Sequence, residues 1–407
     1  KATMDKRIHY GWLICLSCTL LMVCTMGFCN GVFPVYLPFL ERQGMSGAQT
    51  SALLAIRCLF GIAGMLLAEP FYRKLSMRMG LTVTCGITAG AFFLYGVSRT
   101  AWMFDAAAAA SGIGYGLGTM IPVGILMKRW FSKRRGVAVG ICAAGSGISI
   151  TLFSPLITWI IESWGVSVAF RFQAIFVAAV GLLLVALVRD FPASIGLEPY
   201  GGSDCEKSQE QTRSEGGRRP GAEWALVSCF LIGAVATSAP GHFSAHFAAQ
   251  GYEMSLVSLA VSTFGLSLTF GKLVCGELID VLGGRNGPLA LFAAALAGCI
   301  LCCMADGFHG WILFAALILM GVGMAPATVG IPLWAGDFAG GAEYPRVLKW
   351  LQIAYAAGGM ILTMVPGLIF DHTGSYRLAY ALMVLLLAAA MGLLWGAYEI
   401  QKKHRVY

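Results

Sequence analysis

Residues 10–40 read YGWLICLSCTLLMVCTMGFCNGVFPVYLPFL, a stretch without a single charged side chain. A helix needs about 20 predominantly apolar residues to cross the hydrocarbon core of a bilayer, so this stretch is long enough to span it. A signal-peptide core is only about 7–15 residues long. We therefore expect a retained first span, and the same kind of run recurs along the chain.

The composition of the chain excludes a water-soluble fold. Hydrophobic residues make up 58% of the 407 positions, charged residues only 12%, and the mean hydropathy is +0.75. Soluble domains carry about 25% charged residues, so this chain lacks the charge to cover a soluble surface. The sequence predicts an all-α membrane protein.

Twelve apolar runs of span length follow one another, separated by short polar segments. They lie at 10–38, 47–70, 81–98, 102–127, 136–161, 168–188, 224–248, 255–279, 288–305, 311–334, 347–370 and 378–398. The polar segment 189–223 divides six spans from six. We expect two six-helix bundles, residues 1–188 and 224–407, joined by a cytoplasmic linker, an arrangement typical of transporters with internal repeats.

The basic residues predict the orientation of these spans. With the N-terminus placed inside, 22 of the 28 Lys and Arg fall on the inner side, four fall outside and two, Arg57 and Lys272, fall within spans. This asymmetry follows the positive-inside rule. We expect a multi-pass protein of the cell (inner) membrane with both termini in the cytoplasm, and the positive charge calls for no nucleic-acid partner.

Glycines and cysteines also have a place in the apolar runs. Small residues let helices approach closely in lipid, and we expect this of two groups: Gly112, Gly114, Gly116 and Gly118, then Gly140, Gly145 and Gly147. The thirteen cysteines lie mostly inside apolar runs, where cysteine behaves as a small hydrophobe. They predict neither a disulfide framework nor a metal site, and nothing calls for a cofactor.

A polar turn in each half carries a recognisable signature. Residues 276–285 read GELIDVLGGR, and the corresponding turn of the first half, residues 73–80, reads RKLSMRMG. The second-half stretch resembles the inner-loop signature of the major facilitator superfamily. The resemblance implies gating roles for Gly276, Asp280, Gly283 and Arg285, with the aspartate paired to an arginine across the loop. The first-half copy departs from it, with Arg73 in place of the glycine and Met77 in place of the aspartate.

A second set of motifs is similar to one branch of that superfamily. Residues 128–140 read KRWFSKRRGVAVG and resemble the loop between spans 4 and 5 in the monocarboxylate porter and oxalate–formate antiporter branch; HYGW at 9–12, IGLEP at 195–199 and the DHTGSY of 371–376 point the same way. The resemblance implies a secondary transporter of small carboxylates, with Arg134 and Arg135 among the gating residues.

Lys272 is the first candidate for the substrate site. Charged residues inside spans are costly and rare, so they are functional candidates by default. In the resembling branch, the position four residues before the motif glycine carries the cation that holds a substrate carboxylate. The alternatives are a lysine that snorkels to the inner surface or one paired structurally with another helix.

The other candidates for the substrate site are less specific. Arg57, in the outer half of span 2, is a second anion site, an outer gate or a structural residue. Uncharged polar residues near mid-span are further candidates to line the cavity: Asn30, Tyr115, Gln352 and Tyr355, together with Gln173. Lys349, at the inner end of span 11, fits a snorkelling role better than a substrate contact.

Two histidines are candidates for proton coupling. His242 and His246 lie four residues apart in span 7 and so on one helix face. Zinc needs more ligands than two, and we expect no metal there. Proton-coupled members of the branch carry an acid one turn before the span-8 cation, where this chain has Leu268. The second cation of the oxalate exchanger type is replaced by the uncharged residues 351–354.

The sequence thus predicts a monomeric secondary transporter that moves a small organic anion, a mono- or dicarboxylate, by alternating access, as an exchanger or a proton-linked carrier. Its partners are the carboxylate and the lipid bilayer. The alternative is an exporter of a hydrophobic or drug-like compound. A mid-cavity acid would favour that alternative, and none is apparent in the sequence. A membrane enzyme would show clustered His, Asp or Ser.

Overall fold

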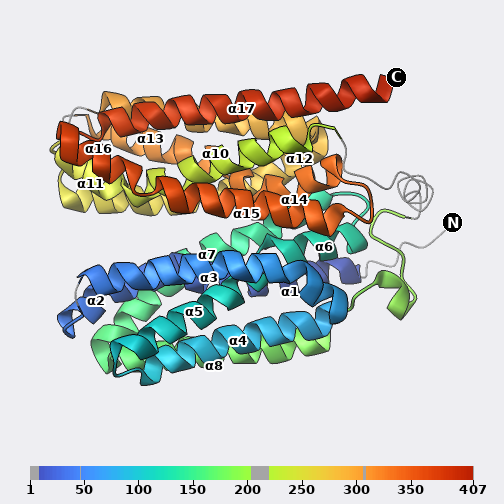
Figure 1. Ribbon diagram of the computed structural model, residues 1–407, viewed down its shortest axis with the longest axis horizontal. Coiled ribbons are helices and arrows are strands. Elements are labelled where there is room, and N and C mark those ends of the chain that lie inside the picture. The colour runs from blue at the N-terminus through green and yellow to red at the C-terminus, as the bar shows by residue number, and fades with distance from the viewer. Residues whose placement is uncertain (1–8, 46, 203–219, 306–308, 407) are drawn as a thin grey trace.

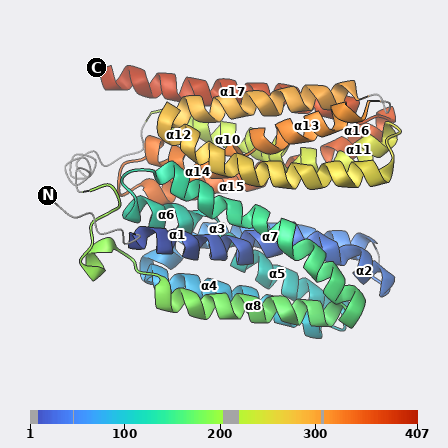
Figure 2. The same ribbon diagram turned by 180° about the vertical axis from the view of Figure 1, so that it is seen from behind.

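The computed structural model describes residues 9–45, 47–202, 220–305 and 309–406, and their regular structure is helical. Figure 1 shows α1–α8 gathered in one bundle and α10–α17 in the other, and Figure 2 shows the same division from behind. We call these the first and the second bundle. The predicted all-helical membrane fold is confirmed.

The bounds of the elements follow the predicted spans closely. In the first bundle they are α1 Tyr10–Met22, η1 Val23–Val32, η2 Phe33–Tyr36, α2 Leu37–Arg42, α3 Gly47–Lys74, α4 Met77–Val97, α5 Ala101–Leu117, α6 Met120–Trp130, α7 Arg135–Trp164 and α8 Val166–Leu187, followed by η3 Pro192–Ile195. In the second bundle they are α10 Ala222–Gly241, α11 Phe243–Ala249, α12 Met254–Met304, α13 Gly310–Gly323, α14 Pro326–Phe338, α15 Tyr344–Leu362, α16 Val365–Thr373 and α17 Arg377–Val406.

Helix α12 contains two of the twelve spans. The described residues hold 11 helical segments long and apolar enough to cross a membrane, one of them the 46-residue stretch Leu259–Met304. Gly283 interrupts this stretch with φ 83° and ψ 166°, a backbone conformation that glycine adopts without a steric penalty. A Cβ on Gly287 would lie 2.8 Å from the carbonyl oxygen of Leu278, whereas nine residues of straight helix rise about 13 Å. The chain therefore turns back at Gly283, and the two sides of the turn are spans 8 and 9.

Several spans are interrupted near mid-length, and four interruptions recur at every third span. They are the π-helical segment η1 in span 1, the break at Gly118–Thr119 in span 4, the break at His242 in span 7 and the break at Met324–Ala325 in span 10. Span 7 therefore consists of two helices, α10 and α11, which together cover the predicted 224–248. Pro240 lies in the last turn of α10, and proline removes a helical hydrogen bond. The period of three spans fits a fold built from three-helix repeats.

Helix α1 begins and α17 ends at the same end of the molecule (Figure 1). We call this end, which the charge distribution predicts to face the cytoplasm, the inner end. Close helix contacts occur through glycine as predicted. A Cβ on Gly116 of α5 would lie 2.1 Å from the carbonyl oxygen of Gly61 in α3, so only glycine permits that crossing.

Candidate functional site

The two bundles touch each other most closely where α7 crosses α12. A Cβ on Gly136 would lie 2.4 Å from the carbonyl oxygen of Gly276, and one on Gly140 would lie 2.5 Å from that of Lys272. Further along α7, a Cβ on Gly147 would meet the hydroxyl of Thr269 at 2.1 Å. Backbone-to-backbone contact at the first two points means that no side chain fits between these helices. The inner half of this interface is therefore closed.

Lys272 of α12 reaches across this interface. Its side chain is buried, and Nζ donates to the hydroxyl oxygen of Ser146 at 2.9 Å and to the carbonyl oxygen of Ala143 at 3.4 Å. Both acceptors belong to α7 of the first bundle. Lys272 precedes Asp280 by eight residues, which places its Cα about 12 Å from the inner end of the helix. The structure adds the partners of this cation, which the sequence did not predict.

Asp280 binds the first turn of α7. Its carboxylate oxygens accept hydrogen bonds from the backbone N–H groups of Gly136 at 2.8 Å and Val137 at 2.9 Å. The first N–H groups of a helix have no partner within the helix, and the helix dipole favours a negative charge there. Asp280 thus joins the second bundle to the first through main-chain donors, a partner that the resemblance does not imply.

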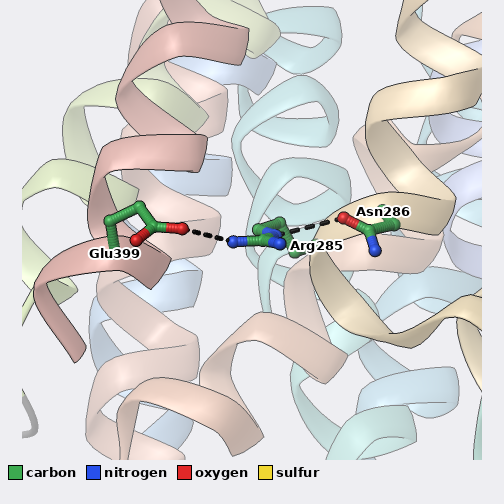
Figure 3. A network of polar contacts seen from close by, with 3 residues as sticks. All are labelled: Arg285, Asn286 and Glu399. Atoms are coloured by element: carbon green, nitrogen blue, oxygen red, sulfur yellow. Dashed lines mark hydrogen bonds and ion pairs between the residues drawn. The ribbon is translucent and has the colours of Figure 1, made fainter. Parts of the chain in front are cut away.

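Arg285 makes its contacts within the second bundle. Its Nη1 lies 2.6 Å from a carboxylate oxygen of Glu399 on α17, and its Nε donates to Asn286 at 3.1 Å, as Figure 3 shows. The guanidinium also lies 4.6 Å from the ring centre of Trp395. Arg285 therefore fastens the turn after Gly283 to the last helix, which differs from the Asp–Arg pair across the loop that the resemblance implies.

Tyr344, at the start of α15, contacts two basic side chains from the first bundle. Arg135 donates to its hydroxyl oxygen at 2.9 Å and to the carbonyl oxygen of Pro332 at 3.1 Å. The ammonium of Lys128 lies 4.1 Å from the ring centre of Tyr344. Arg134 is exposed and adopts the left-handed conformation with φ 56°, which directs the chain into α7. Of the two predicted gating arginines, Arg135 thus contacts the other bundle.

A cross-bundle ion pair was missed at the level of the sequence. Lys349 of α15 lies against the carboxylate of Glu69 on α3. Glu69 is an acid inside a predicted span, and such residues are functional candidates by default. The sequence feature that could have identified Glu69 is its spacing: it precedes Arg73 by four residues, as Lys272 precedes Gly276 at the corresponding place in the second half. Glu69 lies at the inner end of the predicted span 47–70, and Lys349 has a cross-bundle partner where we expected it to snorkel.

Arg57 lies inside the first bundle. Its side chain is 6% exposed, its guanidinium lies 4.7 Å from the ring centre of Phe33, and Nη1 has no hydrogen-bond partner among the described residues. Its neighbour Phe33 gives its depth in the membrane. Gly27 packs against Ser149, which lies one turn beyond Ser146 on α7, and Phe33 comes six residues after Gly27. Arg57 is therefore further toward the outer end than Lys272.

The uncharged candidates come from four different spans. Asn30 is exposed on η1, and Tyr115 of α5 is half-buried against Gly61. On α15, Gln352 and Tyr355 are both buried, and the side-chain oxygen of Gln352 has no partner in the described part of the chain. Gln173, in contrast, accepts a hydrogen bond from Tyr36 within the first bundle at 2.7 Å. A cavity-lining role for the first four stays a prediction.

His242 is the residue between α10 and α11, and His246 lies one turn further along, in α11. The Nδ1–H of His242 donates to the carbonyl oxygen of Ser238 at 2.8 Å, and the Nε2–H of buried His246 donates to that of Cys302 at 2.9 Å. His246 also packs its ring 4.5 Å from that of Tyr380. Both partners belong to the second bundle. The two rings share contact with the ring of Tyr376, and their role in proton coupling stays a prediction.

Comparison with known proteins agrees with this architecture. Residues 19–306 and 225–405 match the sequence pattern of the Major Facilitator Superfamily. These two stretches together cover nearly the whole chain. The chain belongs to the major facilitator superfamily.

Named relatives within the superfamily agree with the predicted resemblance. Over 417 residues the chain is 24% identical to monocarboxylate transporter 13 of Rattus norvegicus, a match that covers 95% of this chain and 88% of the relative. Over 84 residues, 20% of each protein, it is 37% identical to the oxalate:formate antiporter of Oxalobacter formigenes. The solved structure of the proton:xylose symporter XylE superposes with a TM-score of 0.73 at 16% identity and covers 95% of both chains.

This major facilitator protein is a multi-pass membrane transporter, seen here in one state. The cross-bundle contacts of Lys272, Asp280, Arg135 and Glu69 lie in its inner half. These contacts must break before the inner end can open. The structure therefore corresponds to a state whose inner end is closed.

Proposed function

We propose that this transporter moves a small organic anion, a mono- or dicarboxylate, and that Lys272 binds the carboxylate. The observation that carries the proposal is the environment of the ammonium. Lys272 is buried at mid-span, and the described residues give it only neutral hydrogen-bond partners, the Ser146 hydroxyl and a carbonyl. A buried charge without a counter-ion is costly. A substrate carboxylate supplies that counter-ion.

The relatives support the same class of substrate. One of them is named a monocarboxylate transporter and another an oxalate:formate antiporter. Lysine offers a point charge without the two-pronged geometry of arginine. It therefore suits a site in which the charge holds the carboxylate and neighbouring hydroxyl or amide groups make the remaining hydrogen bonds to it. We propose that these hydrogen bonds come from Asn30, Tyr115, Gln352 and Tyr355. Arg57 is a second cation nearer the outer end.

The mechanism that we propose is alternating access. The two bundles, residues 1–188 and 224–407, rock about the site while the linker 189–223 accommodates the movement on the cytoplasmic side. Asp280 and Arg135 act on the balance between the inner-closed and inner-open states, because each contacts the opposite bundle only while the inner end is closed. A ligand shifts such a balance only by binding one state better than the other.

Transport in proteoliposomes tests this proposal. Uptake of radiolabelled acetate, lactate, pyruvate, oxalate and succinate is measured with and without an imposed pH gradient. Lys272→Ala abolishes uptake, since the substrate charge then remains unpaired at a cost of several kcal/mol, and Lys272→Arg keeps part of it. The matched control is Lys402→Ala, which removes an exposed lysine near the inner end of α17 and leaves uptake unchanged.

Two results would contradict the proposal. One is wild-type carboxylate uptake by the Lys272→Ala protein, given an unchanged melting temperature and a monodisperse elution profile. The other is uptake of hydrophobic cations such as ethidium in place of all five carboxylates, which would establish the export of drug-like compounds instead.

A further inference from the structure

Ser146 has two hydrogen-bond partners that connect it to the substrate anchor. Its side chain is buried on α7, it accepts a hydrogen bond from Lys272 Nζ at 2.9 Å, and its own hydroxyl donates to the carbonyl oxygen of Ala143 at 2.9 Å. The same carbonyl lies 3.4 Å from Nζ. The ammonium, the hydroxyl and the carbonyl thus form one closed group that links the second bundle to the first.

We propose that Ser146 is a positioning residue for Lys272, and that the ammonium exchanges the Ser146 hydroxyl and the Ala143 carbonyl for the substrate carboxylate during each cycle. This inference rests on the proposed function. A hydrogen bond between two charged groups is roughly twice as strong as one between neutral groups. A carboxylate therefore outcompetes a neutral hydroxyl and a neutral carbonyl for the same ammonium.

Because Ser146 lies at the interface between the bundles, this exchange of hydrogen-bond partners affects the opening of the inner half as well as substrate binding. Glycines flank it at 140 and 147, and both are in contact with α12, so Ser146 stays next to Lys272 as long as the bundles stay together. When the site is empty, the Lys272–Ser146 bond holds the inner half closed. When a carboxylate occupies the ammonium, this bond is released and the bundles are free to separate.

The consequence is a preference for exchange over net flux. An empty carrier must break the bond between Lys272 and Ser146, and leave a buried ammonium without its partners, before it can reorient. A loaded carrier has already replaced those partners. The geometry therefore slows the return of the empty carrier, which is the step that separates net efflux from one-for-one exchange.

Ser146→Ala tests the inference directly. With the hydroxyl gone, the substrate no longer competes with it, and we expect the KM for lactate and oxalate exchange to fall by about tenfold to a hundredfold, the range for loss of one hydrogen bond to a charged group. Net efflux of radiolabelled lactate into substrate-free buffer should rise toward the exchange rate. Ser146→Thr, which keeps the hydroxyl, should restore both values.

Ser149→Ala is the matched control. Ser149 lies one turn further along α7, is equally buried, and donates to the carbonyl oxygen of Val23 within the first bundle. Its loss tests the general effect of removing a buried hydroxyl from α7. It should leave both the KM and the ratio of net efflux to exchange unchanged.

Three results would overturn the inference. An unchanged KM and ratio would mean that the Ser146 bond plays no part in the cycle. A raised KM would mean that the hydroxyl binds the substrate together with Lys272. A parallel fall in exchange and efflux would mark a structural role. If Lys272→Ala is inactive while Ser146→Ala behaves as wild type, the proposed function stands and only this inference fails.

Discussion

Glu69 of α3 and Lys349 of α15 form an ion pair that joins the two bundles near the inner end. The side chains are 27% and 12% exposed, so both are largely removed from water. Glu69 stands four residues before Arg73, as Lys272 stands four before Gly276. Each half of the chain thus places a charged side chain at the same point of its repeat, and each reaches the opposite bundle: Lys272 contacts α7 and Glu69 contacts α15.

This ion pair occupies the side of the molecule where the first-half signature lacks its aspartate. Met77 stands at the position that Asp280 holds in the second half, and a methionine cannot accept hydrogen bonds from the start of a neighbouring helix. The Glu69–Lys349 pair supplies a cross-bundle contact on that side, two helical turns deeper. The inner end is therefore closed by unlike contacts in the two halves.

We expect Glu69→Gln to lower the transport rate and the melting temperature, because it leaves Lys349 without its counter-ion. Removing one partner of a buried pair typically costs about 3–5 kcal/mol, and the partial exposure of Glu69 reduces that cost here. The exchanged pair Glu69→Lys with Lys349→Glu should recover most of the loss. The measurement is lactate exchange together with thermal unfolding, and a charge exchange no better than the single variant would refute the pair as a functional contact.

Asp280→Asn should slow turnover more than it weakens binding. The substitution removes the negative charge that faces the start of α7, while Lys272, the residue that we propose to bind substrate, is two turns away. We expect the maximal exchange rate to fall several-fold with the KM nearly unchanged. Glu277→Gln, an exposed acid one turn earlier on the same helix, is the control and should have no effect. A change in KM alone would contradict the gating role.

Gly140→Ala should open the inner end. The added Cβ would lie 2.5 Å from the carbonyl oxygen of Lys272, and a backbone atom cannot move aside as a side-chain end can. The contact between α7 and α12 must therefore loosen, which destabilises the inner-closed state. Hydrogen–deuterium exchange at the first turn of α7 should become faster.

The control for that substitution is Gly90→Ala on α4. No atom lies within 4 Å of the position of its Cβ, and alanine in a helix is more stable than glycine by up to about 1 kcal/mol. Exchange at α7 should be unchanged in this variant. Equal exchange rates in the two variants would show that the Gly140 contact does not keep the inner end closed.

The double substitution of His242 and His246 to Gln should leave pH-gradient-driven uptake in place. Each ring uses one N–H on a carbonyl of its own bundle, and the acid of the proton-coupled relatives is replaced by Leu268. We therefore expect exchange, or anion flux with protons carried by the substrate. Loss of pH-driven accumulation with counterflow preserved would make the histidine pair the proton carrier.

Much of the fold was available from the sequence alone. In a bilayer every backbone polar group must be satisfied within the helix, so the length of an apolar run reports a span directly. The apolar runs follow from this constraint, and the glycines at the helix crossings follow from the close approach of helices in lipid. The break of span 7 at His242 was not predicted, because hydropathy does not register a helix break between apolar residues.

The candidate site was predictable only in part. A cation at mid-span is visible in the sequence because charge is costly there, and Lys272 stood out for that reason. Its partner Ser146 did not, since it is 126 residues away and is one of many hydroxyls in apolar helices. Glu69 did not stand out, because it lies one residue before the end of the predicted span 47–70, where a charged side chain can reach the membrane surface.

The sequence by itself thus determined the class of fold and the succession of spans, since both depend on the local cost of placing polar groups in lipid, and its motifs indicated the superfamily. Only the tertiary structure decided which groups pair across the interface. Asp280 meets the start of α7, Arg285 meets Glu399, and Lys349 meets Glu69 at a separation of 280 residues. These pairings depend on how helices far apart in the sequence pack together, and that packing leaves no periodic or local pattern in the sequence.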